Sequence, residues 1–185
     1  MPSTPKANRG PSAGPENRRA LIAAAREVFD AEGLSAPFSA VARKAGVGQG
    51  SLYRHFPDRT ALAVAIFDEN LSELEEFVDR ADSTLDGLLH LVIEQAVVST
   101  AFIDLIWAHS SDERVVHLGD RLRTLVEREV GRARDAGGIG GHVTVDDVLL
   151  AVSMLAGVLA RSDAAERRVA GNRAVDLFAL AFAPR

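Results

Sequence analysis

Five residues in one short stretch carry hydrogen-bonding side chains: Gln49, Ser51, Tyr53, Arg54 and His55. Leu52 and Phe56 lie four residues apart in the same stretch, so in a helix they share the opposite, apolar face. A slim helix of this kind can enter the major groove of DNA, where amides and hydroxyls read base edges and other polar groups contact phosphates. The residue types and their spacing therefore predict a nucleic-acid reader.

A second helix must hold this one at a fixed angle. Phe38, Val41, Ala42 and Ala45 recur at helical spacing just before it, and Gly46 follows them. Glycine adopts the left-handed conformation that ends a helix without steric cost. We therefore predict a helix from residue 38, a turn at Gly46 and a second helix from about Gln49, which together form a helix-turn-helix.

At these residues the chain resembles a known family. The run AGVGQGSLYRHFPDRTAL, residues 45–62, is similar to the TetR-type helix-turn-helix, whose usual form is AGVSxGxLYxHFxxKxxL. The similarity begins with Ala24, Ala25 and Phe29 before Gly33 and runs to about Phe67, which is roughly a third of the chain. It implies a homodimeric transcriptional regulator, a repressor that leaves a palindromic operator when a small molecule binds its C-terminal domain.

Residue chemistry suggests a role for each candidate DNA contact. Gln49 and Ser51 are expected at base edges, and Gly50 would allow close approach of the helix backbone. Arg54 could contact a base or a phosphate, or simply face solvent. The candidates for phosphate contacts are Tyr53, His55, Arg43, Lys44 and Arg59. Two further residues, Ser39 and Val47, are expected in the same interface. For Arg43, Lys44 and Arg59 the alternative is an ordinary solvated cation.

Two residues depart from the family pattern. Pro37 stands where a hydroxyl side chain usually caps the first helix of the motif, so we expect Pro37 in the first helical turn and the cap at Ser35 or Ala36. Gly48 replaces a common serine and removes another polar group from the start of the second helix.

The rest of the chain shows helical periodicity and no strand-like alternation, which predicts an all-α protein of about nine helices. A proline-rich arm is expected at 1–15, in which Lys6 and Arg9 could reach a minor groove, and the DNA-binding domain at 16–75, with its motif at 37–56. A ligand-binding and dimerisation domain would occupy 76–185. The further helices are expected at about 16–32, 59–80, 84–100, 102–109, 112–136 and 145–160, with a last one through Val175 to Phe182.

The segment VLLAVSMLAGVL, residues 148–159, is apolar nearly all round. Such a helix is either central in its own subunit or part of a subunit interface. The last helix also has a wide apolar face, so the last two helices of two subunits could form a four-helix bundle. The alternative is a monomer with a buried hydrophobic hairpin.

Charge is divided unevenly along the chain. Residues 1–60 contain nine Lys or Arg and five Asp or Glu, whereas residues 61–185 contain twelve and twenty-one. A basic end on a chain of net charge −5 would orient that end toward a polyanion. The chain has no cysteine and no apolar run of membrane-spanning length, so we expect a cytoplasmic protein without disulfides, thiolate metal sites or membrane contact.

The ligand is less evident from the sequence. His90, Phe102, Trp107 and His109 are candidates because they lie in otherwise aliphatic helices, although Phe102 and Trp107 could be ordinary core residues. The spacing of His109 and His117 gives little support to a metal site, and no cofactor motif is present. The alternatives are a regulator without a small-molecule ligand, constitutive or controlled by a partner protein, and an enzyme. No phosphate-binding glycine loop or nucleophile motif supports the enzyme.

Overall fold

The computed structural model describes residues 14–185, apart from the side chain of Ala164. Most of the predicted N-terminal arm, including Lys6 and Arg9, therefore lies outside the described residues. Gly14 and Pro15 were assigned to that arm, but they form the first turn of helix α1. Proline is tolerated there because its missing N–H would have no partner within the helix.

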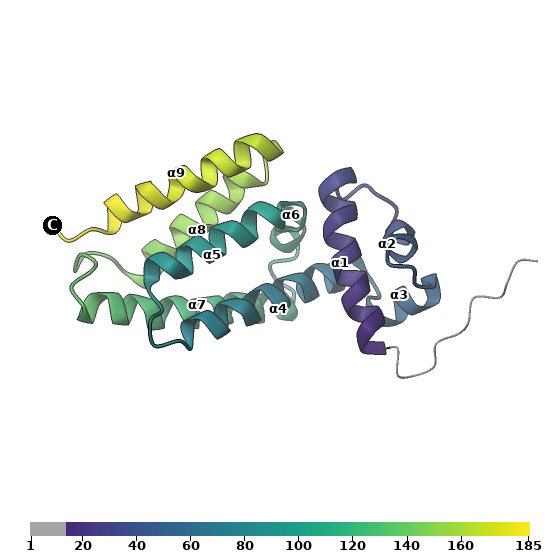
Figure 1. Cartoon of the computed structure of the whole chain (residues 1–185), viewed down its shortest axis with the longest axis horizontal. Helices are drawn as coiled ribbons and strands as arrows, with labels where there is room; N and C mark the ends of the chain where they lie inside the picture. The colour runs from purple at the N-terminus through teal and green to yellow at the C-terminus, as the bar shows by residue number, and fades with distance from the viewer. Residues whose placement is uncertain (1–13) are drawn as a thin grey trace, which may run out of the picture. The chain divides into compact units, whose positions relative to one another are not determined.

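The described residues form nine helices and no strands, which confirms the predicted fold class (Figure 1). The helices are α1 (Gly14–Glu32), α2 (Phe38–Lys44), α3 (Gln49–His55), α4 (Arg59–Val78), α5 (Leu85–Val98), α6 (Thr100–Ala108), α7 (Glu113–Asp135), α8 (Val145–Leu159) and α9 (Ala164–Phe182). The chain divides into two compact units, Met1–Leu62 and Ala63–Arg185. This division falls within α4, and the domain limit at 75/76 stays a prediction.

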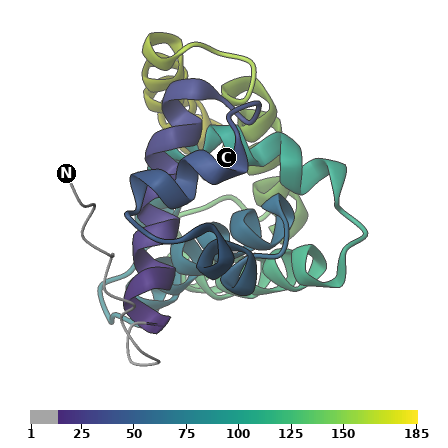
Figure 2. The ribbon, with the colours of Figure 1, turned by 90° about the vertical axis from the view of Figure 1, so that its right-hand side faces the viewer.

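The first unit is built around the apolar faces of its short helices, which are purple and blue in Figure 2. Leu21 and Phe29 of α1, Val41 of α2 and Leu52 of α3 are all buried, and Phe56 closes the same core. Gly46 has φ 68° and follows α2, as the sequence predicts. The turn between α2 and α3 therefore depends on a conformation that residues with a side chain rarely adopt.

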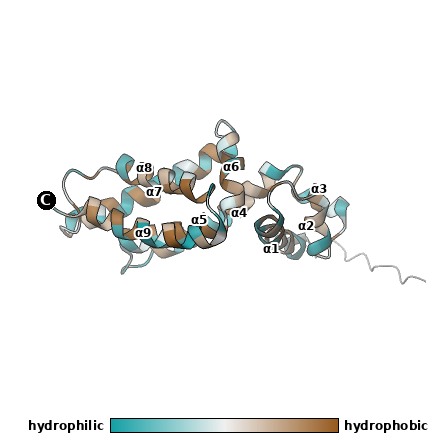
Figure 3. Cartoon of the chain, turned by 90° about the horizontal axis from the view of Figure 1, so that it is seen from above, coloured by the Kyte–Doolittle hydropathy of each residue, from teal (hydrophilic) through white to brown (hydrophobic). Residues whose placement is uncertain are grey.

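The second unit is a helical bundle in which α5 packs against α7, α8 and α9. Its core is aliphatic, and α6 is largely hydrophobic along its length (Figure 3). Side chains fix the helix starts: Thr84, Asp112, Thr144 and Asp163 each accept a hydrogen bond from a backbone N–H in the first turn. Because Asp163 and Glu166 form a capping box, α9 begins well before the apolar residues from which we predicted it.

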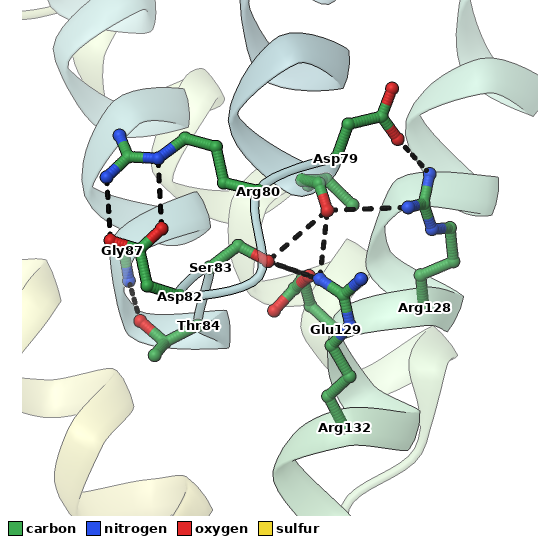
Figure 4. Close-up of polar contacts among 10 residues, drawn as sticks. Asp79, Arg80, Asp82, Ser83, Thr84, Gly87, Arg128, Glu129 and Arg132 are labelled. Carbon is green, nitrogen blue, oxygen red and sulfur yellow. Dashed lines mark hydrogen bonds and ion pairs between the residues drawn. The ribbon is translucent and has the colours of Figure 1, made fainter.

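A polar cluster joins the corner between α4 and α5 to α7 (Figure 4). Arg132 donates to the carbonyl oxygen of Val78 at 2.9 Å, to Glu129 Oε1 at 2.6 Å and to Ser83 Oγ. Ser83 donates in turn to Glu129 Oε1 at 2.9 Å, and Arg128 pairs with Asp79 at 2.9 Å. The C-terminal end of α4 is thus held by charged hydrogen bonds from α7.

Within residues 14–185 no single helix has the length and hydropathy needed to cross a membrane. Among the described residues, one pair of consecutive helices, α5 and α6, reaches that length and hydropathy together, but the two helices meet at a 92° bend.

Candidate nucleic-acid interface and ligand cavity

Helix α3 presents the polar face that its sequence predicts. Gln49, Gly50, Tyr53 and Arg54 are exposed, and Ser51 and His55 are half-buried. Leu52 points the other way and is fully buried. The predicted base-reading and phosphate-binding side chains therefore lie together on one surface of the first unit, over an apolar support.

An aromatic contact holds Tyr53 in place. Its ring meets that of Phe38 edge to face, with the ring centroids 5.6 Å apart, and the residue keeps 51% of its surface exposed. This geometry is typical of favourable aromatic pairs. Since Phe38 begins α2, the Tyr53 ring is held by a contact within the helix-turn-helix itself and remains half exposed.

Arg59 has protein partners that the sequence did not reveal. Its guanidinium donates to the backbone oxygens of Leu34 at 2.7 Å and Ala36 at 2.5 Å, and it lies over the rings of Phe29 and Phe38. These bonds fix the segment between α1 and α2. Arg59 therefore needs no phosphate to explain its position at the start of α4, where Asp58 supplies the cap to the N–H of Ala61.

The start of α2 differs from the prediction. Pro37 itself is the N-cap, with φ −58° and ψ 132°, so the cap does not move to Ser35 or Ala36. No side chain caps α2 or α3, and Gly48 precedes α3 in an extended conformation. The residue before a helix normally has an extended backbone, which proline can adopt. Proline also lacks a backbone N–H, but an N-cap residue does not need one to begin the helix.

The remaining predicted contacts lie on or beside α2. Ser39 and Val47 are half-buried, whereas Arg43 and Lys44 are exposed. Lys44 pairs with Glu27 of α1 at 2.6 Å, but both side chains are more than half exposed, so water weakens this pair.

A cavity of about 280 Å³ lies inside the second unit. Helices α4 to α8 contribute its lining residues: Phe67, Asn70, Leu71, Leu74, Val92, Gln95, Ala96, Ile103, Ile106, Trp107, Val115, Leu118, Gly119, Leu122, Val152, Ser153 and Ala156. Its volume is close to the lower end of the range for small-molecule sites, roughly 300–1,000 Å³.

Of the four ligand candidates, only Trp107 lines this cavity. Phe102 is buried in the core, and His90 lies in a separate open groove beside Glu73 and Glu94. His109 is exposed, with Nδ1 2.8 Å from the carbonyl oxygen of Leu105. The described part of the chain brings no three His, Asp or Glu residues together as a metal site.

Comparison with known proteins agrees with this geometry. Residues 21–66 match the family model for bacterial regulatory proteins of the tetR family. A 72-residue stretch is 40% identical to the A-factor receptor protein of Streptomyces griseus and covers 37% of this chain and 26% of that protein. The crystal structure of a TetR transcriptional regulator from Streptomyces coelicolor superposes with a TM-score of 0.67 at 27% identity, over 90% of this chain and 98% of that one. Residues 21–66 therefore form a TetR-type DNA-binding domain.

The TetR resemblance is strongest at the helix-turn-helix. The chain spans about a quarter to a third of the length of the curated relatives it matches, which are named as a receptor and as transcriptional regulators. The crystal structure of a gamma-butyrolactone receptor shares the fold, with a TM-score of 0.57 at 22% identity over 86% of this chain and 84% of that one. The TetR-type DNA-binding domain is thus defined by sequence, and the second unit by fold.

The chain also exposes an apolar surface in its second unit, on α8 and α9. Leu150, Met154 and Val158 of α8 are each at least half exposed. Val169 and Leu180 of the adjacent α9 are about three-quarters exposed. Of the two alternatives for the 148–159 helix, central burial within one subunit therefore does not occur.

Proposed function

We propose that this protein is a homodimeric transcriptional repressor that binds a palindromic operator and is released by a small molecule. The observation that carries the proposal is the exposed polar face of α3, supported by buried Leu52 and an edge-on Phe38–Tyr53 contact. A helix presented in this way fits the major groove, with Gln49 and Ser51 toward base edges and Tyr53 toward phosphate.

The exposed apolar residues of α8 and α9 support the dimer. Large apolar patches on a chain surface mark interaction sites, and a two-fold axis is the commonest way to cover one with a second copy. The two helices from each subunit would then form a four-helix interface. Two recognition helices related by this axis would read the half-sites of a palindrome, about 34 Å apart.

The cavity in the second unit supports control by a small molecule. One relative is named as a receptor for A-factor, and a structural neighbour is a gamma-butyrolactone receptor. A ligand would lower operator affinity only if it bound the DNA-free conformer more tightly. The apolar cavity favours this mode of control over a regulator without a ligand, for which a collapsed second unit would be expected.

Selection from random genomic fragments across a salt series tests the function. The wild type should recover a shared inverted repeat, with affinity that falls steeply as salt rises. Tyr53→Ala should lose most of this binding, whereas His90→Ala, exposed in the second unit, should retain it. Weak binding without a shared motif, equal in all three proteins, would overturn the regulator.

A further inference from the structure

The cavity of the second unit is lined only by uncharged residues, all of them within the described part of the chain. Fourteen of the seventeen are glycine or apolar, and three have polar side chains, namely Asn70, Gln95 and Ser153. A charged ligand would lose its water on entry and find no opposite charge among these residues. That loss is costly, so the lining favours a neutral ligand.

Two of the polar lining residues, Gln95 and Ser153, offer hydrogen-bond acceptors to the cavity. The amide nitrogen of Gln95 already donates to the backbone oxygen of Asn70 at 3.1 Å and to Glu73 Oε2 at 3.0 Å. Both of its hydrogens are therefore engaged, and its carbonyl oxygen remains. Ser153 donates its one hydroxyl hydrogen to the carbonyl oxygen of Leu149 at 2.8 Å, which leaves its lone pairs. A ligand that bonds to Gln95 or Ser153 must therefore bring a hydrogen-bond donor.

Trp107 forms the outer wall of the cavity. It lines both the cavity and an open surface groove that it shares with Ile106, Ser110 and Val115, and it is 48% exposed. Its ring lies over Gly157 of α8, where an added Cβ would meet Trp107 Cη2 at 3.4 Å. Trp107 is also the one tryptophan of the chain, so its fluorescence reports on this wall alone.

We propose that the cavity binds a compact, uncharged, mainly aliphatic molecule that carries a hydroxyl group. The hydroxyl donates to the Gln95 carbonyl oxygen or to Ser153 Oγ, and the aliphatic part lies among Leu71, Leu118 and Trp107. This inference rests on the proposed control by a small molecule and adds the chemical class of that molecule.

Three probes with the same eight-carbon chain test the class: 1-octanol, octanoate and octylammonium. Each is titrated into the full-length, DNA-free protein at pH 7, and Trp107 emission and calorimetric heat are recorded. We expect saturable binding of 1-octanol, about tenfold or more tighter than either ion, because an unpaired charge is costly in this lining. Absence of saturable octanol binding, or equal binding of either ion, overturns the proposal.

Matched variants locate the binding. An added Cβ at Gly119 of α7 meets no atom within 4 Å and would enter the cavity, so Gly119→Met should abolish octanol binding. Gly131→Met, in equally open space on the same helix but away from the cavity, should not. Ala156→Leu serves as the second filling variant if circular dichroism shows that Gly119→Met is unfolded. Ser153→Ala and Gln95→Met should together weaken octanol binding by about two- to tenfold or more.

The readout separates this inference from the proposed function, because no DNA is present. Octanol binding that persists in both filling variants would place the probe elsewhere and overturn the assignment. A protein that selects an operator but discriminates against neither ion refutes the ligand class alone. Loss of operator selection with octanol binding intact would instead refute the regulator.

Discussion

The guanidinium of Arg121 in α7 donates to both carboxylate oxygens of Glu75 in α4, at 2.8 and 2.9 Å. A third donor reaches Asp68, two turns earlier in α4, at 2.5 Å. Hydrogen bonding to Glu75 is the main cause that raises the pKa of Arg121 above its usual value. Leu71 lies between the two acidic residues in the sequence and lines the cavity, so Arg121 joins α7 to α4 beside the cavity.

Arg121→Ala should lower the free energy of unfolding of the second unit by about 1–2 kcal/mol, because a partly buried bidentate pair and a second ion pair are lost together. Arg123→Ala, on the same helix with an exposed partner in Asp146, should cost less than about 1 kcal/mol. Urea titrations of both variants measure the difference. Equal costs would show that the Arg121 bonds add little.

Arg59→Leu should destabilise the first unit by about 1–3 kcal/mol, since the carbonyl oxygens of Leu34 and Ala36 would lose their donors. Affinity for selected operator DNA should fall with it, because the segment before α2 would no longer be fixed. Arg54→Ala, an exposed residue of α3, should leave stability within about 0.5 kcal/mol. Denaturant unfolding and DNA titration are measured on both variants. A residue that positions the motif changes stability and DNA affinity together, whereas a residue that only contacts DNA changes the affinity alone.

Gly46→Ala should cost about 1 kcal/mol or more, because alanine is strained at φ 68°. Gly50→Ala should have the opposite effect on stability, since Gly50 lies within α3 and an added Cβ meets nothing there. If the α3 backbone approaches the duplex, Gly50→Ala should nevertheless weaken operator binding. Melting temperatures and DNA affinities of the two variants are compared. A Gly50→Ala protein that binds normally would remove Gly50 from the interface.

Leu150→Asp combined with Leu180→Asp should convert the dimer to a monomer, because each places a charge in an apolar interface. Sedimentation velocity gives the oligomeric state. His117→Asp, an exposed change on α7, should leave the dimer intact. A wild-type protein that is monomeric at micromolar concentration would contradict the proposed four-helix interface.

The cap of α7 predicts a pH dependence. Hydrogen bonds from the Arg114 side chain and backbone lower the pKa of Asp112 to about 2, below its unfolded value near 3.9. Because the folded state favours the ionised carboxylate, Asp112 stabilises the fold at pH values above its unfolded pKa. This stabilisation is lost as the pH falls through about 2. The melting temperature of the wild type should therefore exceed that of Asp112→Asn above about pH 4, and the difference should narrow toward pH 2. A constant difference would mean that the charge is not responsible.

The sequence was sufficient where local rules determine the structure. Leu52, Phe56 and Gly46 follow from helical spacing and glycine conformation, and the starts of α5, α7 and α8 follow from their capping residues. The start of α9 was missed because the search followed apolar periodicity, although Asp163 and Glu166 show the capping-box spacing.

The polar residues that line the cavity could not be predicted because they come from three separate helices. Asn70, Gln95 and Ser153 meet only through packing, and no spacing along the chain relates them. Arg59 shows the same limit. Its partners lie 23 and 25 residues earlier, so the sequence suggested a phosphate contact and did not reveal that Arg59 bonds the segment before α2.

Every residue that lines the cavity belongs to the second unit, and the α3 polar face belongs to the first. A substitution that alters one surface therefore leaves the chemistry of the other unchanged. The first unit must keep a shape that fits the constant geometry of DNA, whereas the cavity has only to stay apolar. The two surfaces can then diverge at different rates, so that aliphatic replacements can reshape the cavity while the polar face of α3 stays the same.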